Sequence, residues 1–113
     1  MPFINTKTTV ALNDTKKETL TNGICRIAKE CLGKGESWVM TGYEDNASLS
    51  FRGDTSNLAY IEVKLFGNPS SSGTSQMTSK LCSLFGQELS ISADHIYVSY
   101  FPTDNWGWNG NNF

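Results

Sequence analysis

A proline directly after the initiator methionine, Pro2, is the position with the most unusual chemical potential in this sequence. Methionine is removed when the second residue is small, and the processed chain would then begin with the secondary amine of Pro2. Model α-amino groups titrate at about pH 8, and burial beside apolar rings lowers that pKa, which would leave a neutral base near neutral pH. Such a base could remove a proton from the carbon next to a carbonyl group. The position also allows the simpler interpretation that Pro2 merely follows the start codon.

Histidine and cysteine, which often serve in catalysis and metal binding, form no familiar site here. The single histidine, His95, stands at the start of a predicted strand, which makes a Ser-His-Asp triad or a multi-histidine zinc site implausible, and we expect it to be structural or solvent-facing. No Cys-x-x-Cys sequence occurs, which argues against a dithiol redox site. Cys25 and Cys31 are too far apart along one predicted helix to form a bridge, and Cys82 is remote. We therefore expect three reduced thiols that belong to the core.

Two short motifs carry weaker signals. Glu44 and Asp45 are neighbouring acids, but adjacent residues of a strand point to opposite faces, so the pair more simply opens a turn. Arg52-Gly53-Asp54 spells an integrin-binding tripeptide, although matches of three residues often arise by chance. Neither motif by itself predicts a function.

Composition limits the function classes. The 113 residues (12.5 kDa) suit a single domain, 1–113, that can bury a core without disulfides or metal. A formal charge of −2 and nine basic residues without a basic block argue against nucleic-acid binding. No apolar stretch approaches the ~20 residues that span a membrane, and the N-terminus has no secretory leader pattern. We expect a soluble protein of the cytoplasm, with no nucleic-acid or membrane partner.

Six main elements must position the candidate residues. Strands are predicted at 2–10, 37–44, 59–66 and 95–101, with a short extended piece at 48–51, and helices at 15–32 and 74–89. The apolar residues of the two helices fall on one side of each: Leu20, Ile24, Ile27, Ala28 and Cys31 in the first, and Met77, Leu81, Leu84, Phe85 and Leu89 in the second. The strand 59–66 has the clearest alternation of small aliphatic with larger or charged residues.

The ends of the first helix have recognisable capping signals. Thr15 and Glu18 have the spacing of a capping box, while Asn13 and Asp14 are competing caps. Gly33 stands where a left-handed residue ends a helix. We expect the chain to leave the helix at Gly33.

The two halves, 2–44 and about 58–101, share the order strand, helix, strand. Two such units predict an α+β fold, a four-stranded sheet with both helices on one face. The opposite face would carry a mixture that is too aromatic to stay bare: Trp38, Met40, Tyr60, Glu62, Lys64, Phe66, Tyr97 and Ser99. Another subunit is the expected cover.

Four segments in a fixed order resemble the macrophage migration inhibitory factor branch of the tautomerase superfamily. They are Met1-Pro2, Gly33-Lys34, the run from Ile91 to Tyr100, and the C-terminal run from Trp106 to Phe113. The resemblance spans nearly the whole chain. It implies two β-α-β units per subunit and a homotrimer whose sheets enclose a central barrel, which would cover the non-helical face.

The resemblance also implies a site for cofactor-independent and metal-independent keto-enol tautomerisation of phenylpyruvate-like aromatic α-keto acids. Pro2 would be the catalytic base, and Lys34 would meet the carboxylate or the enolate charge. The implied substrate-binding residues are Phe3, Trp38, Lys64, Leu65, Phe66, Tyr97, Ser99, Trp106, Trp108 and Phe113, with Tyr97 supplied by a neighbouring subunit. Apart from the resemblance, Lys34 has a simpler explanation, because a lysine near the end of a helix meets the helix dipole favourably.

Several positions depart from the family pattern. Ser99 stands where the family often has asparagine, Phe66 replaces a smaller aliphatic residue, and Trp38 and Trp106 enlarge the aromatic walls. We therefore expect a narrower pocket than the family pattern implies. The segment 57–60 lacks the two cysteines of the mammalian Cys-x-x-Cys motif, so that oxidoreductase activity should not carry over. Arg52 occupies a family glycine position.

Two function classes remain open from the sequence. The first is an enzyme, a phenylpyruvate-type tautomerase and therefore an isomerase. The second is a cytokine-like signalling protein, secreted without a leader, that binds a host receptor through its surface. The amine, the cation and the aromatic walls together favour the enzyme.

Overall fold

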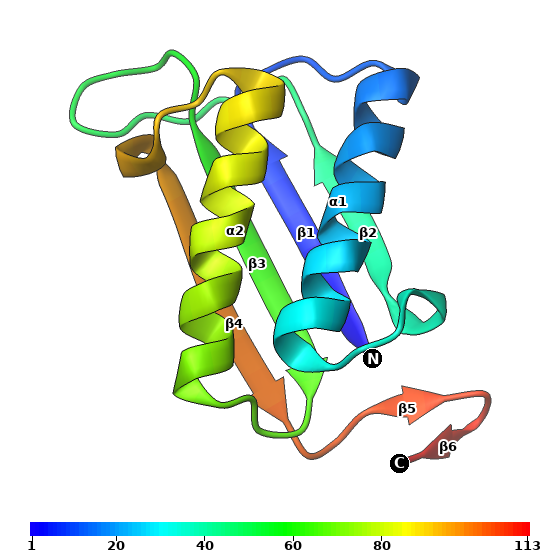
Figure 1. Cartoon of the computed structure of the whole chain (residues 1–113). Helices are drawn as coiled ribbons and strands as arrows, with labels where there is room; N and C mark the ends of the chain where they lie inside the picture. The colour runs from blue at the N-terminus through cyan, green and yellow to red at the C-terminus, as the bar shows by residue number, and fades with distance from the viewer.

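Alternating burial along two central strands sets the architecture. The computed structural model describes residues 1–113, and its sheet has the order β2-β1-β3-β4 (Figure 1). The strands are β1 (Pro2–Thr8), β2 (Met40–Glu44), β3 (Ala59–Phe66) and β4 (Ile96–Thr103). β1 and β3 are antiparallel, whereas β2 runs parallel to β1 and β4 parallel to β3. This mixed sheet confirms the predicted α+β fold.

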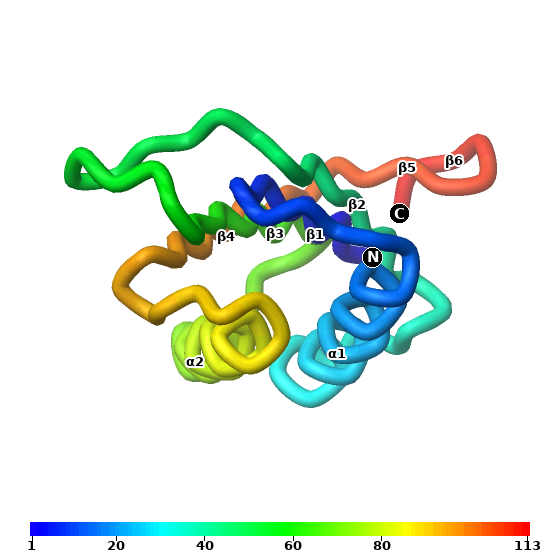
Figure 2. The backbone as a smooth tube through the Cα atoms, turned by 90° about the horizontal axis from the view of Figure 1, so that it is seen from above, coloured from blue at the N-terminus to red at the C-terminus, as the bar shows by residue number.

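Both helices lie on one side of the sheet, as Figure 2 shows. They are α1 (Asp14–Leu32) and α2 (Ser71–Leu89), and neither is long and apolar enough to cross a membrane. The other face has no helix over it, and Met40 and Tyr97 on it are 67% and 62% exposed. As predicted, therefore, the helices of the single chain leave this face of the sheet uncovered.

The helix starts differ from the predicted ones because other side chains make the caps. The side chain of Asn13 accepts the backbone N–H of Lys16, so the Thr15 capping-box prediction is wrong and the competing cap is the real one. Helix α2 begins at Ser71 instead of residue 74, because the Ser70 hydroxyl accepts the N–H of Gly73. The exit at Gly33, with φ 66°, is confirmed.

Strand ends and short elements also differ from the prediction. Residues 36–38 form a 3-10 turn, η1 (Glu36–Trp38), so β2 starts only at Met40. The first strand ends at Thr8 rather than residue 10, and β4 starts one residue late, after the 3-10 turn η2 (Ala93–His95), and continues to Thr103. The segment 48–51 forms no strand, only an isolated bridge from Phe51 to Asp54.

A hairpin near the C-terminus was missed by the sequence reasoning. It consists of β5 (Gly107–Trp108) and β6 (Asn111–Asn112), joined by Asn109 and Gly110 at φ 53° and 84°. Asn-Gly is the strongest short-range signal for a two-residue hairpin turn, so the signal was present in the sequence.

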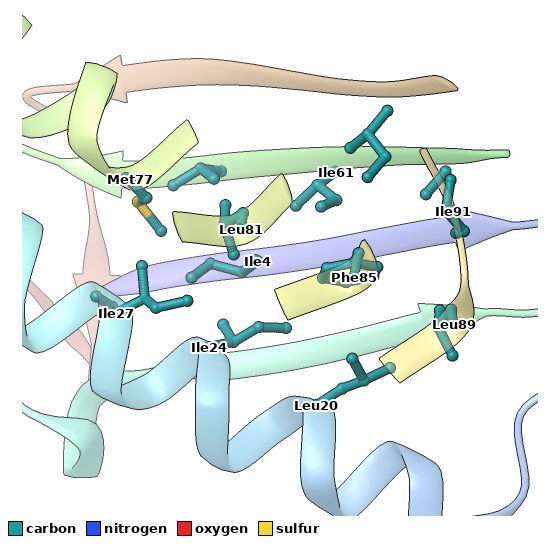
Figure 3. Close-up of a cluster of buried hydrophobic side chains, with 14 of the residues drawn as sticks. Ile4, Leu20, Ile24, Ile27, Ile61, Met77, Leu81, Phe85, Leu89 and Ile91 are labelled. Carbon is teal, nitrogen blue, oxygen red and sulfur yellow. The ribbon is translucent and has the colours of Figure 1, made fainter. Parts of the chain in front are cut away.

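The core fills the space between the helices and the covered face of the sheet. Phe85 of α2 is fully buried and lies among side chains from β1, α1 and the loop before β4 (Figure 3). The alternating residues of β3, Ala59, Ile61, Val63 and Leu65, all contribute to the same cluster, as predicted. This continuous core holds the ends of β1, α1 and β3 in fixed relative positions.

Gly73 is a point where the two helices come too close for a larger residue. A Cβ at this position would lie 2.6 Å from the backbone carbonyl oxygen of Cys31 and 3.0 Å from the capping hydroxyl of Ser70. We expect Gly73→Ala to lower the free energy of unfolding by about 1 kcal/mol, because the backbone clash outweighs the gain in helix propensity. Denaturant unfolding measures this loss. Gly35→Ala is the matched control, since nothing lies within 4 Å of that Cβ, and an equal loss in both variants would contradict the clash.

Candidate active site

Three elements meet at the end of the sheet where the chain begins. Pro2 starts β1 opposite Leu65 of β3, and Lys34 follows the left-handed Gly33 that ends α1. The ammonium of Lys34 donates a hydrogen bond to the carbonyl oxygen of Phe66, 3.2 Å away. Figure 1 shows the start of β1, the end of α1 and the end of β3 at the same end of the molecule. We call Pro2, Lys34 and Phe66 the N-terminal corner.

The electrostatics of the corner favour a neutral amine. Burial, and after it the positive charge of Lys34, lower the pKa of the Met1 α-amino group. The same cation would attract an anionic group placed beside the start of β1. The Met1 amine and the Lys34 cation therefore lie close enough to influence each other.

The cavity at this corner is small in the single chain. It has a volume of about 90 Å³ and is lined by Leu32, Lys34, Leu65, Phe66, Gly67, Asn68 and Pro69. Ligand pockets typically measure about 300–1,000 Å³, so one chain does not enclose a drug-sized molecule here. The sequence reasoning missed Asn68 and Pro69, which sit in the turn after β3 and carried no signal beyond turn composition.

An aromatic cluster extends from the corner along the C-terminal hairpin. The ring centroids of Trp38 and Trp108 are 4.8 Å apart, and Phe113 lies 5.5 Å from Phe66 and 6.3 Å from Trp38. The carbonyl of Trp106 accepts the N–H of Phe113 at 3.0 Å and so ties the last residue to the hairpin. Trp38, Trp108 and Phe113 remain between 41% and 54% exposed. The chain thus presents a bare aromatic wall beside a cation.

Three other predicted binding residues lie on the strands near the corner, in different orientations. Leu65 is 1% exposed and belongs to the core. Lys64 places its ammonium 5.9 Å from the Phe101 ring centroid. Phe3 is half-buried, and its ring would lie 3.1 Å from a Cβ at Gly42.

Tyr97 and Ser99 lie toward the opposite end of the sheet. The β3–β4 register pairs Tyr60 with Tyr97, six residues before Phe66 on β3, or roughly 20 Å along the strand. Ser99 shares a hydrogen bond of 2.6 Å with the Tyr60 hydroxyl. Within one chain, therefore, neither residue joins the N-terminal corner.

A second cavity surrounds Tyr97. It has a volume of about 200 Å³ and is lined by Leu49, Ser50, Phe51, Leu58, Ala59, Tyr60, His95 and Tyr97. Its walls come from the segment between β2 and β3, which lies at the end of the molecule away from the C-terminal hairpin (Figures 1 and 2). No motif in the sequence pointed to this cavity.

The acidic pair is split between separate contacts. Glu44 accepts a hydrogen bond from the Asn5 amide at 2.7 Å, whereas Asp45 accepts the backbone N–H of Leu12 at 2.7 Å. The bond from Leu12 lowers the pKa of the Asp45 carboxyl. Asp45 is thus a local support for the loop before α1, and no pair of acids faces a common substrate.

The tripeptide and the cysteines also have local roles. Arg52 and Gly53 form a tight turn, while the Asp54 carboxylate accepts hydrogen bonds from Ser56 and lies 3.2 Å from His95, so it is engaged within the chain. The φ of 55° at Arg52 lies in the region that favours glycine, which explains why the resembled family has glycine there. Cys25 is buried, Cys31 and Cys82 are half-buried, and all three thiols are free.

Comparison with known proteins covers the entire chain. A family model described as macrophage migration inhibitory factor (MIF) matches residues 1–113. The macrophage migration inhibitory factor of Xenopus laevis is 24% identical over 115 residues, covering 100% of this chain and 99% of that protein. The crystal structure of Leishmania major MIF2 is 39% identical with a TM-score of 0.95, covering 100% of this chain and 97% of that one. A macrophage migration inhibitory factor homologue from Prochlorococcus marinus is 34% identical with a TM-score of 0.86, covering 98% of both chains.

Proposed function

This chain belongs to the macrophage migration inhibitory factor family, and from that premise we propose that it is a phenylpyruvate-type keto-enol tautomerase. In the proposed enzyme, the Pro2 nitrogen, freed by removal of Met1, is the general base. The observation that carries the proposal is the junction of β1, α1 and β3, where the Lys34 ammonium donates a hydrogen bond to the Phe66 carbonyl oxygen beside the chain start. The surroundings that lower the pKa of the Met1 amine would act on the Pro2 nitrogen once Met1 is removed. The folded chain acts as a single domain, 1–113.

The reaction needs a base, a charge and a shaped wall, and no cofactor or metal. The neutral Pro2 nitrogen takes a proton from the carbon next to the keto group, and the electron pair moves onto the carbonyl oxygen. That oxygen then takes up a proton from water, and the Pro2 nitrogen returns its proton to water, so the base is restored and the product is the enol with no net change in atoms or electrons. Lys34 stabilises the negative charge during the transfer, since a fixed cation in a dry site acts more strongly than water.

The substrate class follows from the surroundings of the corner. An aryl ring would pack against Trp38, Trp108 and Phe113, while a carboxylate would meet Lys34. Phe3, Phe66 and Trp106 would border the same space, and the backbone at Lys64 and Leu65 would line its floor. An aromatic α-keto acid such as phenylpyruvate fits this combination.

A homotrimer would complete the pocket. The cavity of about 90 Å³ is too small for an aryl keto acid, and Tyr97 of the same chain lies roughly 20 Å along the sheet. We therefore place Tyr97 and Ser99 of one copy at the pocket of its neighbour. The bare aromatic face of the sheet supplies the surface for such an assembly.

The test combines three measurements on one preparation. Intact mass establishes loss of Met1, phenylpyruvate tautomerisation measures activity, and light scattering gives the assembled mass. We expect turnover by the processed protein at three times the 12.5 kDa chain mass. Absence of turnover in processed, assembled protein would overturn the enzyme proposal, and a fully active monomer would overturn the shared pocket.

Lys34 provides a sharper test of the charge. We expect Lys34→Ala to lower kcat/KM for phenylpyruvate about 10²-fold, the effect typical of removing one group that stabilises an oxyanion. Lys34→Arg should retain part of the activity because the cation remains. Lys29→Ala is the matched control, because it also removes a cation from the last turn of α1. If Lys29→Ala lost as much activity, Lys34 would act only through the helix dipole.

The second candidate function is cytokine-like signalling through a host receptor after export without a signal peptide. Its support is that curated relatives, including the Xenopus laevis protein, carry the name macrophage migration inhibitory factor. Receptor binding that survives Pro2→Gly, in a protein whose wild type has no turnover, would favour this function over the enzyme. Failure to bind a receptor panel would count against it.

A further inference from the structure

His95 lies between two carboxylates on different segments. Its Nδ1 is 2.8 Å from Asp94 Oδ1, and its Nε2 is 3.2 Å from Asp54 Oδ2. A neutral imidazole carries only one N–H, so both hydrogen bonds to carboxylates can exist together only when the ring is protonated. The hydrogen bond to Asp94 chiefly, with the charges of Asp94 and Asp54 adding to it, raises the pKa of His95. The protonated ring thus links η2 to the Asp54 turn.

The Asp54 turn transmits this link to Phe51. The backbones of Phe51 and Asp54 exchange two hydrogen bonds of 2.9 Å across a two-residue loop, in which Arg52 and Gly53 have φ of 55° and 76°. Positive φ at both central residues is the geometry of a tight hairpin turn, which leaves its two ends little independent movement. A contact that holds Asp54 therefore also holds Phe51.

Phe51 in turn contacts the ring of Tyr97. Its centroid lies 5.1 Å from Tyr97 and 5.9 Å from His95, in both cases in an edge-to-face arrangement. Tyr97 is otherwise 62% exposed, so Phe51 is its main aromatic support within the chain. The four residues His95, Asp54, Phe51 and Tyr97 form what we call the histidine relay.

We propose that His95 is a positioning residue for Tyr97: when protonated, it holds the turn 51–54 against the start of β4 and thereby fixes the Tyr97 ring. The consequence for catalysis rests on the proposed function, in which Tyr97 completes the pocket of a neighbouring copy. Loss of the proton releases one of the two carboxylates. The substrate is then bound less well, while the proton transfer at Pro2 is little changed.

The groups that face His95 determine the direction of the pH effect. The titratable ones are Asp54 of the turn, Asp94 of η2, and Tyr60 and Tyr97 of the adjoining cavity, while the Arg52 cation lies 5.5 Å from the Phe51 centroid. The other polar neighbours carry no charge: Ser56, Asn57, Ser90 and Ser92. The pKa of His95 is raised in the folded chain. The hydrogen bonds from the protonated ring to both carboxylates are therefore fully present below the ordinary pKa of histidine, and one of them is lost as pH rises through the pKa of the folded chain.

The first arm of the test needs no activity. Protein labelled with 3-fluorotyrosine gives a fluorine resonance for Tyr97, assigned with Tyr97→Phe, and the imidazole of His95 is titrated by NMR in the same sample. We expect the Tyr97 resonance to shift with the His95 titration, and Asp54→Asn to lower the pKa of His95 and displace the resonance. A Tyr97 resonance that ignores both pH and Asp54→Asn would overturn the relay, whether or not the protein is an enzyme.

The second arm uses kinetics with phenylpyruvate. We expect His95→Ala to raise KM about two- to tenfold, the range for one lost hydrogen bond, with kcat within about twofold. His95→Arg should restore a low KM and make it independent of pH in the range where wild type varies. Glu30→Gln, which breaks an exposed ion pair with Lys80, is the matched control and should leave KM unchanged. An unaltered KM in His95→Ala would overturn the relay. Absence of turnover in the wild-type protein would overturn only the proposed function.

Discussion

Pro2→Gly is expected to lower kcat/KM for phenylpyruvate by about 10²- to 10⁴-fold, the contribution typical of a positioned general base. Glycine leaves an α-amino group but removes the ring that holds the nitrogen at the head of β1, opposite Leu65. The remaining activity should come from Lys34 and from binding. Initial rates of tautomerisation, with intact mass confirming that Met1 is absent from both proteins, measure the loss.

The pH profile separates loss of the base from loss of structure. Burial and the Lys34 charge lower the pKa of the Met1 amine, and we expect the same surroundings to act on the Pro2 nitrogen once Met1 is removed. The kcat/KM should then rise as pH increases through a value below that of an ordinary α-amino group. Insertion of alanine between Met1 and Pro2 is the control, because it leaves the ring but converts its nitrogen to an amide. Equal turnover by the wild type and the inserted variant would refute the role of the nitrogen.

Phe85→Ala is expected to lower the free energy of unfolding by about 3–5 kcal/mol, the usual range for deleting a buried aromatic side chain. Phe85 is fully buried among side chains of the core cluster (Figure 3), so its truncation removes buried apolar surface and leaves a cavity. Denaturant unfolding at a fixed chain concentration measures the change, since assembly would add to apparent stability.

Phe101→Ala is the matched control for the core prediction. Phe101 lies on the face without helices and is 44% exposed, so its removal should cost about 1 kcal/mol or less. Below the unfolding transition, Phe85→Ala should retain kcat/KM because Phe85 does not line the proposed substrate pocket. Similar losses of unfolding free energy in the two variants would contradict the burial of Phe85 in the core.

Element types followed from local spacing, whereas element ends did not. The alternation along 59–66 and the one-sided helices were confirmed. Burial of one face imposes a regular spacing of apolar residues, which can be detected directly in the sequence. The helix starts were wrong because Ser70 and Asn13 were each one of several residues able to cap. Which of them does so depends on where the preceding strand or loop delivers the chain.

The candidate site was likewise predicted only in part from the sequence, because the position of some of its residues depends on contacts between distant parts of the chain. The sequence and its family resemblance named Pro2 and Lys34, and the fold places both at one corner. The separation of Tyr97 from that corner needed the β3–β4 register, because a strand pattern states which face a residue occupies but not which residue lies opposite. The contact of His95 with Asp54 needed the left-handed turn at Arg52, a conformation that its residue type disfavours.

By itself the sequence determined the order of strands and helices, the covered and bare faces of the sheet, and the candidate base and cation. The elements and faces follow from side-chain periodicity and the base from residue type and position, which act over a few neighbouring residues, whereas the cation came from the family resemblance. Only the tertiary structure decided the strand register, the size of the corner cavity, the aromatic hairpin contacts and the histidine relay. Each of these depends on distances between residues far apart in the chain, and those distances are set by how the whole core packs.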